Sequence, residues 1–241
     1  MTVRVLVVEH ESHCPPALFG TWLTEAGAVV DVCRPYAGDT LPTAPEHDAL
    51  VVLGGSMDAG DDQHPWLEPT RTLIRTAADR GLPTLGICLG HQLCALAFGG
   101  AVGRSPLGQQ VGLYEIGWTD AAADDALLGG LASGGRAVQW NDDLVLELPD
   151  DAVVLARTPR DELQAARFAP TVWGVQWHPE VDVEVLRVWA EEDADRHLER
   201  GIDQHAVLAE IDGAARELAT TWRPLAESLV ALAATSRRTP A

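Results

Sequence analysis

The 241-residue sequence contains no lysine, so all 17 of its basic side chains are arginines. The missing lysine rules out any chemistry that runs through a lysine Schiff base. Positive charge is also scarce, because the formal net charge is −19 at pH 7 and no stretch gathers basic residues into a patch. Phosphate contacts need clustered positive charge, so the composition argues against a general nucleic-acid binder.

Cysteines and long apolar runs are few as well. The four cysteines follow no framework spacing, so neither a disulfide scaffold nor a CxxC zinc site is indicated, and we expect free thiols. No run of about 18 apolar residues occurs, and the first residues read as a strand instead of a charged and then apolar leader. We therefore expect a globular cytoplasmic protein with no membrane contact, no cofactor and no metal.

The first hundred residues alternate strand-like and helix-like segments. Short apolar runs rich in β-branched residues predict strands, and segments with helical periodicity that end near glycine follow them. The predicted strands are residues 3–8, 29–33, 50–53 and 83–87, and the predicted helices are 16–26, 65–80 and 89–98. Near-continuous apolar strands alternating with helices indicate an α/β fold, with a mostly parallel central sheet and helices on both faces.

From about residue 113 the pattern changes to short, partly alternating segments separated by Gly, Pro or Asp turns. This pattern predicts an inserted set of antiparallel strands. Their expected positions are 113–119, 137–140, 144–148, 152–158 and 163–168. Residues 173–177 form one more apolar strand, which returns the chain to the main sheet.

Helical patterns follow from residue 181, with a break expected at Pro224 and a frayed tail from Ser236. The sequence contains no internal repeat and no low-complexity linker. We therefore predict a single domain over the whole chain, with a core of about 1–190 and a C-terminal helical extension of about 191–235.

The stretch PTLGICLGHQ, residues 83–92, places Cys88 where an apolar strand ends and a helix begins. Active sites of open α/β folds lie at the carboxyl ends of the parallel strands. The start of a helix carries partial positive charge and unpaired N–H groups, which favour thiolate over thiol. Gly86 and Gly90 suit a sharp strand-to-helix elbow that strains its central residue and brings other backbone close. Cys88 is therefore a candidate nucleophile.

The segment WGVQWHPE supplies the partners that such a nucleophile needs. His178 follows an apolar strand, Glu180 comes two residues later, and Pro179 fixes the backbone between them. In a Cys-His-carboxylate triad the imidazole takes the thiol proton and returns it to the leaving group, while the carboxylate sets the tautomer. The three residues fit these roles in chain order.

The motifs GICLGHQ around Cys88 and WGVQWHPE around His178 and Glu180 resemble the two signatures of class I glutamine amidotransferases. These triad enzymes release ammonia from the side-chain amide of glutamine. LGGSM, residues 53–57, is similar to the glycine-rich loop of the family. The resemblance extends over the whole chain and is closest to stand-alone members without a synthase domain. It implies a flavodoxin-like α/β fold and, as substrate, glutamine or another γ-glutamyl compound.

The resemblance also implies roles for further residues. The backbone N–H groups of Gly55 and Leu89 would hold the oxyanion of the tetrahedral intermediate, and losing one such donor costs about 10²–10³ in rate. Gln92 would contact the glutamine substrate. In the stretch WNDD this chain departs from the family, because Asn141 stands where a histidine is usual. That loop helps to hold the amino-acid end of the substrate, so Asn141 and Asp142 are candidate substrate contacts.

The departure at Asn141 leaves the identity of the substrate open. The adjacent carboxylates of Asp142 and Asp143 would attract an α-ammonium group and repel an α-carboxylate. We therefore expect free glutamine to be a poor substrate by itself. Activity would rise for a γ-glutamyl compound without a free α-carboxylate, or when a partner subunit orders this loop.

The other cysteines have a simpler interpretation, because a single cysteine is most often a small core residue. We expect this of Cys14, Cys33 and Cys94. His91 lies three residues after Cys88 on the same predicted helix, and we favour a packing or hydrogen-bonding role for it over catalysis.

Asp61, Asp62 and His64 together suggest a metal site, but they follow Gly60 in a loop, which favours a solvated turn. The histidines with no motif around them are expected to be solvated or locally bonded. They are His10, His13, His47, His64, His197 and His205.

Two hypotheses of different classes remain at this point. The first is an enzyme that hydrolyses a γ-glutamyl amide through a thioester and either releases the ammonia or passes it to an acceptor or synthase subunit. A close variant is a hydrolase of γ-glutamyl conjugates. The second is a catalytically silent or regulatory partner that keeps the fold, against which the complete triad argues. A homodimer is a further possible assembly.

Overall fold

The predicted strands of the first half of the chain join one sheet in the computed structural model, which describes residues 2–236. The strand order is β2-β1-β3-β4-β12-β11-β10-β7. The first five of these strands are parallel, and the pairs β12–β11, β11–β10 and β10–β7 are antiparallel. The strands are β1 (Arg4–Val8), β2 (Val29–Cys33), β3 (Ala49–Val52), β4 (Thr84–Ile87), β7 (Gly117–Trp118), β10 (Val153–Arg157), β11 (Leu163–Ala169) and β12 (Val172–Val175). The predicted mostly parallel sheet is confirmed.

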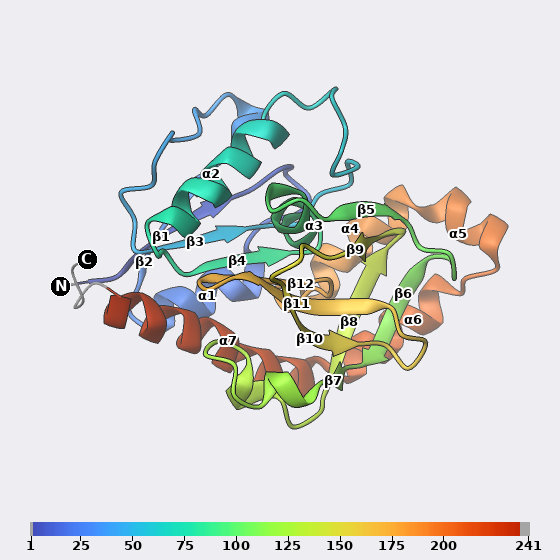
Figure 1. Ribbon diagram of the computed structural model, residues 1–241. Coiled ribbons are helices and arrows are strands. Elements are labelled where there is room, and N and C mark those ends of the chain that lie inside the picture. Colours follow the sequence, from blue (N-terminus) through green and yellow to red (C-terminus); the bar gives the residue numbers. More distant parts are fainter. Residues whose placement is uncertain (1, 237–241) are drawn as a thin grey trace.

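Helices cover both faces of this sheet because its buried strands are apolar on both sides (Figure 1). Val5 and Val7 of β1 face one core with α1 (Ala17–Glu25) and α7 (Ala215–Ser236). Leu6 and Val8 face the opposite core with α2 (Leu67–Asp79) and α3 (Leu89–Ala97). The alternation of side chains along one strand thus supplies both layers.

The inserted strands form two further antiparallel pairs. They are β5 (Ala101–Arg104) with β9 (Asp143–Glu147), and β6 (Gln110–Glu115) with β8 (Arg136–Asn141). The single strand predicted over residues 113–119 is wrong, because the chain divides at Ile116. The part before Ile116 pairs with β8, whereas β7 after it pairs with β10 of the main sheet. β5 was not predicted. The insertion also holds the short helices η2 (Asp120–Ala122) and η3 (Gly129–Leu131), and η1 (Pro35–Ala37) follows β2.

The C-terminal part is helical, as predicted, with α4 (Val183–Glu192), α5 (Ala194–Arg200), α6 (Gln204–Gly213) and α7. The break predicted at Pro224 is wrong, because α7 continues through it. An internal proline costs about 3 kcal/mol, and buried Trp222, Leu225 and Leu229 on the same helix offset this cost by packing into the core. Helix α7 extends to Ser236, and the rest of the predicted frayed tail lies outside the described residues.

The C-terminal helices share the core of the sheet, since α7 packs along α1 and both belong to one apolar cluster. This packing supports our proposal of a single domain. Over residues 2–236, none of the helices combines the length and the apolar character that a membrane crossing needs.

Candidate active site

Cys88 lies at the elbow between β4 and α3, at the carboxyl end of the parallel strands. Its backbone has φ 51° and ψ −106°, which is a rare conformation for a residue that carries a Cβ. The elbow is held because the Cys88 N–H donates to the Val175 carbonyl at 2.9 Å and the Cys88 carbonyl accepts from the Gln92 N–H at 3.1 Å. The strained elbow predicted from the sequence is therefore present, and strain of this kind concentrates at functional sites.

His178 and Glu180 reach the site from the segment that follows β12. The strand was predicted to run to residue 177, but it ends at Val175 because the chain then crosses between sheets. The Gln176 N–H donates to the Gln164 carbonyl of β11, whereas the His178 N–H donates to the Val138 carbonyl of β8, at 2.7 and 2.8 Å. This crossing aims the imidazole at the elbow.

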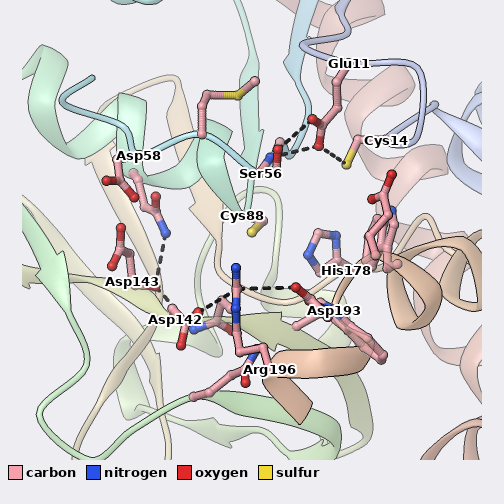
Figure 2. A pocket seen from close by; sticks show the side chains of 18 of the residues that line it. Glu11, Cys14, Ser56, Asp58, Cys88, Asp142, Asp143, His178, Asp193 and Arg196 are labelled. Carbon is pink, nitrogen blue, oxygen red and sulfur yellow. Dashed lines mark hydrogen bonds and ion pairs between the residues drawn. The ribbon is translucent and has the colours of Figure 1, made fainter. Parts of the chain in front are cut away.

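The His178 ring is held on two sides. Its Nδ1 lies 2.7 Å from Glu180 Oε1, and the two side chains are 3% and 2% exposed. The indole of Trp189 packs edge-on against the ring, with 4.7 Å between centroids, and donates its own N–H to the His13 carbonyl at 2.7 Å. Cys88 and His178 share one cavity, as Figure 2 shows.

The charges around His178 favour its protonated form. Burial by itself lowers the pKa of His178, but the negative charges of Glu180 and Cys88, with hydrogen bonds to both, raise that pKa to about 10. An imidazolium placed between a carboxylate and a sulfur is the arrangement that supports a thiolate nucleophile.

The cavity above the elbow has a volume of about 420 Å³. Of the site residues predicted from the sequence, those that line it are Gly55, Cys88, Gln92, Asn141, Asp142 and His178. Leu89 and Glu180 do not line it. Leu89 lies beneath Gly55, since a Cβ on Gly55 would be 2.9 Å from Leu89 Cδ2, and Glu180 lies behind His178.

The glycine-rich loop after β3 runs directly past the two reactive side chains. A Cβ added to Gly54 would lie 3.1 Å from His178 Cε1 and 3.5 Å from Cys88 Cβ. Only a residue without a side chain lets the loop approach this closely without displacing the imidazole. The loop is therefore placed where its N–H groups can approach a carbonyl oxygen bound at Cys88.

Asn141 is almost fully buried at the end of β8. Its Nδ2 donates to the Asp143 carbonyl at 3.2 Å and to Gln110 Oε1 at 3.5 Å, and its Oδ1 is buried with no hydrogen-bond partner within residues 2–236. The same Asp143 carbonyl accepts from Gln92 Nε2 at 3.1 Å. One backbone carbonyl thus joins the residue that departs from the family pattern to the predicted substrate contact.

The carboxylates beside Asn141 are not free. Asp142 forms ion pairs with Arg200 at 2.7 Å, Arg196 at 3.1 Å and Arg104 at 3.4 Å. Burial raises the pKa of Asp143, Arg104 lowers it in part, and the neighbouring Asp58 and Asp142 raise it further. The negative charge expected from this pair of residues is therefore largely balanced by arginine.

Sequence reasoning missed Glu11, which anchors the glycine-rich loop from the opposite side of the cavity. Glu11 Oε1 accepts from the Ser56 N–H at 2.8 Å, and Oε2 accepts from the Ser56 hydroxyl at 2.7 Å. Figure 2 shows Glu11 and Cys14 on one side of Cys88, and Asp58 and Asp143 on the other. No spacing signal relates Glu11 to Ser56, because the contact spans 45 positions.

Cys14 is more than the core residue that we predicted, because it also lines the cavity. Its Sγ donates to Glu11 Oε1 at 3.2 Å. Burial raises the pKa of Cys14 well above its ordinary value, and the charge of Glu11 adds to the effect. Cys14 is thus held as a thiol, while Cys33 and Cys94 are buried in the opposite core as predicted.

His91 has the predicted packing role. It is fully buried, its ring lies 5.2 Å from that of Phe168 between centroids, and a Cβ on Gly174 would be 2.4 Å from its Nδ1. Burial lowers the pKa of His91 to about 3, so the ring is neutral. His91 lies inside the fold and not in the cavity.

The prediction that His10 is solvated or locally bonded is wrong. Its side chain is fully buried after β1, and neither ring nitrogen has a hydrogen-bond partner in the described part of the chain. Burial, followed by the charge of His64, lowers the pKa of His10 to about 3. His64 itself bonds Asp61 at 2.7 Å in the predicted turn. The other histidines are bonded or exposed: His13 pairs with Glu192, His47 with Asp31 and His197 with Gln204, and His205 is exposed.

The fold and this arrangement are those of a triad amidotransferase, and the family model described as glutamine amidotransferase class-I matches residues 22–187. The chain belongs to the class I glutamine amidotransferase family. A crystal structure of a glutamine amidotransferase from Thermotoga maritima superposes with a TM-score of 0.84 and 26% identity, covering 95% of this chain and 99% of that one.

Curated relatives extend the likeness. A glutamine amidotransferase-like protein of Salmonella typhimurium, YfeJ, is 33% identical over 189 residues, which cover 76% of this chain and 78% of that protein. The glutamine-hydrolyzing GMP synthase of Aeropyrum pernix is 36% identical over 78% of this chain but only 30% of its own length. Gamma-glutamyl peptidase 5 of Arabidopsis thaliana is 33% identical over 58% of this chain and 57% of that protein.

Proposed function

We propose that this protein hydrolyses the side-chain amide of glutamine, or an equivalent γ-glutamyl amide, with Cys88 as nucleophile, His178 as acid and base and Glu180 as its orienting carboxylate. The observation that carries the proposal is the position of His178. Its Nδ1 is 2.7 Å from Glu180 Oε1, and its ring is hydrogen-bonded to Cys88 at a strained elbow. These are the three contacts that nucleophilic catalysis by a thiolate requires.

The proposed reaction has two halves. The Cys88 sulfur attacks the amide carbon, and the N–H groups of Gly55 and Leu89 stabilise the resulting oxyanion. His178 then donates its proton to the departing nitrogen, so that ammonia leaves and a thioester remains. In the second half, neutral His178 takes a proton from water, the hydroxide attacks the thioester, and the proton returns to the Cys88–His178 pair as the carboxylate product leaves.

The ammonia acceptor is proposed to be a separate synthase subunit. The support is the likeness to a relative whose name joins glutamine hydrolysis to GMP synthesis. The identity of the acceptor for this chain is open. Free release of ammonia is the alternative outcome of the same chemistry.

A second candidate is the hydrolysis of γ-glutamyl conjugates larger than glutamine. The cavity of about 420 Å³ extends from Cys88 to Arg104 and Arg196, so an amide with a bulkier leaving group has room beside the sulfur. Asn141 at the family's histidine position and the likeness to a plant γ-glutamyl peptidase also favour this candidate. The reacting residues are the same in both cases.

The test is trapping with a glutamine-analogue electrophile, followed by peptide mass spectrometry and by assays of ammonia release. Wild type should be labelled at Cys88, and Cys88→Ser should not. Cys14→Ser is the matched control, because Cys14 lines the same cavity, and this variant should keep the label on Cys88. Folded wild type that takes no label and releases no ammonia from glutamine or from γ-glutamyl dipeptides would favour a catalytically silent partner.

A further inference from the structure

Gln176 is a polar residue of the site to which no role has been assigned. It follows β12 by one residue, and its side chain is fully buried. Residues two apart on an extended chain share a face, so Gln176, His178 and Glu180 point to the same side, whereas Trp177 enters the opposite core beside Trp222. The side chain of Gln176 is thereby directed at the elbow.

The amide of Gln176 contacts the sulfur itself. Its Nε2 lies 3.6 Å from Cys88 Sγ, and its Oε1 lies 3.4 Å from Gln92 Nε2. Both groups are buried, so water does not compete for either contact. A neutral donor at this position adds a hydrogen bond to the sulfur without adding a titrating charge.

The direction of the Gln176 amide is set by a backbone carbonyl. The Asp143 carbonyl can only accept, so the end of Gln92 that lies 3.1 Å from it must be the NH₂ group. That NH₂ group also faces Gln176, which therefore presents its oxygen to Gln92 and its own NH₂ group to Cys88. The ambiguity that usually attends amide orientation is removed by this chain of contacts.

We propose that Gln176 is a further catalytic residue of the amide hydrolysis, which donates an N–H to the Cys88 sulfur, stabilises its thiolate form and holds it in line for attack. The inference rests on the proposed function of this site. It adds a fourth side chain to Cys88, His178 and Glu180, and it couples the nucleophile to Gln92, the predicted substrate contact.

The other titratable groups that face Cys88 come from two elements. His178 and Glu180 approach from the segment after β12, and Cys14, bonded to Glu11, approaches from the loop after β1. None of them bonds Gln176 among the contacts of residues 2–236. A change at Gln176 that leaves these groups in place therefore reports on the N–H to the sulfur.

The test compares wild type with Gln176→Met, which keeps the length of the side chain but removes the donor, and with Gln176→Glu, which keeps the shape but offers only acceptors. The measurement is the rate of iodoacetamide alkylation of Cys88 against pH, read from the Cys88 peptide. Because a hydrogen bond to a charged group is lost, the midpoint should rise by about one pH unit in Gln176→Met and by more in Gln176→Glu. The kcat for ammonia release should fall by about tenfold, with KM nearly unchanged.

Gln139→Met is the matched control. Gln139 is also a fully buried glutamine, on β8, but its amide bonds Gln164 and not the sulfur. Its alkylation profile should equal that of wild type. The inference is overturned if Gln176→Met keeps the wild-type midpoint and kcat, or if Gln139→Met shifts the midpoint equally. Failure of the proposed function is distinguishable, since wild type would then release no ammonia although its alkylation midpoint still responds to Gln176.

Discussion

Gly86 and Gly90 interlock across the elbow, since a Cβ added to Gly86 would lie 2.3 Å from the carbonyl oxygen of Gly90. A Cβ on Gly90 would in turn lie 2.0 Å from the carbonyl oxygen of Val52. Real Cβ atoms do not come this close to backbone, and the obstructing atoms cannot rotate away. The two glycines that frame Cys88 in the sequence are therefore needed for packing of the backbone.

We predict that Gly90→Ala lowers the free energy of unfolding by at least about 3 kcal/mol, because helix α3 must move away from β3 to admit the methyl group. Gly60→Ala is the control, as nothing lies within 4 Å of a Cβ there. It should change stability by less than about 0.5 kcal/mol. Urea denaturation of both variants checks the prediction, and a Gly90→Ala protein as stable as wild type would contradict the packing described here.

Replacing the nucleophile should separate activity from folding. Cys88→Ala is expected to abolish ammonia release and keep the fold, since the smaller side chain fits the elbow. Cys88→Gly should also be inactive but more stable than Cys88→Ala by about 1 kcal/mol, because glycine adopts φ 51° without strain. Activity assays and thermal melts of the two variants test this, and wild-type ammonia release by Cys88→Ala would disprove the assignment of the nucleophile.

The members of the proposed triad should differ in importance. His178→Ala is expected to cost nearly as much as Cys88→Ala, because no other group near the sulfur can carry the proton. Glu180→Gln keeps a partner of similar shape at 2.7 Å and should cost less. Removing the Glu180 charge should also lower the pKa of His178 and move the alkaline limit of the pH–rate profile downward. Equal losses in the glutamine and alanine variants would argue against an orienting role.

The departure at Asn141 predicts an effect on substrate choice. Asn141→His is expected to raise kcat/KM for free glutamine by about tenfold, because a ring nitrogen reaches further toward the amino-acid end of the substrate than a short amide does. Asn141→Asp, which adds a charge beside Asp143, should lower it. The measurement is kcat/KM for glutamine and for a γ-glutamyl conjugate. A wild-type protein that already matches the histidine variant on glutamine would show that the departure is neutral.

Buried neutral histidines predict a loss of stability in acid. Burial lowers the pKa of both His10 and His91 from 6.5 to about 3, so between these values the unfolded chain binds protons that the folded chain does not. Stability therefore falls as pH drops below about 6.5, by up to about 1.4 kcal/mol per pH unit for each histidine. Denaturation at pH 7, 6 and 5 should show a slope that is shallower by about one proton in His91→Leu. An unchanged slope would mean that His91 takes up no proton on unfolding.

Much of the site follows from local pattern. An apolar strand that ends in Cys88 between two glycines specifies an elbow, because the bend, the helix start and the exposed thiol all depend on neighbours within a few positions. The two-residue spacing of His178 and Glu180 acts in the same way. It also carried the signal for Gln176, which sequence reasoning overlooked because a buried glutamine in an apolar strand has no evident partner until the fold is known.

By itself, then, the sequence determined the alternation of strands and helices, the two motifs and the family resemblance, since these depend on short-range periodicity and spacing. Only the tertiary structure decided that the chain divides at Ile116, that α7 passes through Pro224 and that arginines balance Asp142. Partners for these features lie far away in sequence, as Arg200 does from Asp142, separated by 58 positions. No local pattern encodes such distances, because they arise when sheets and helices from opposite ends of the chain bury a common core.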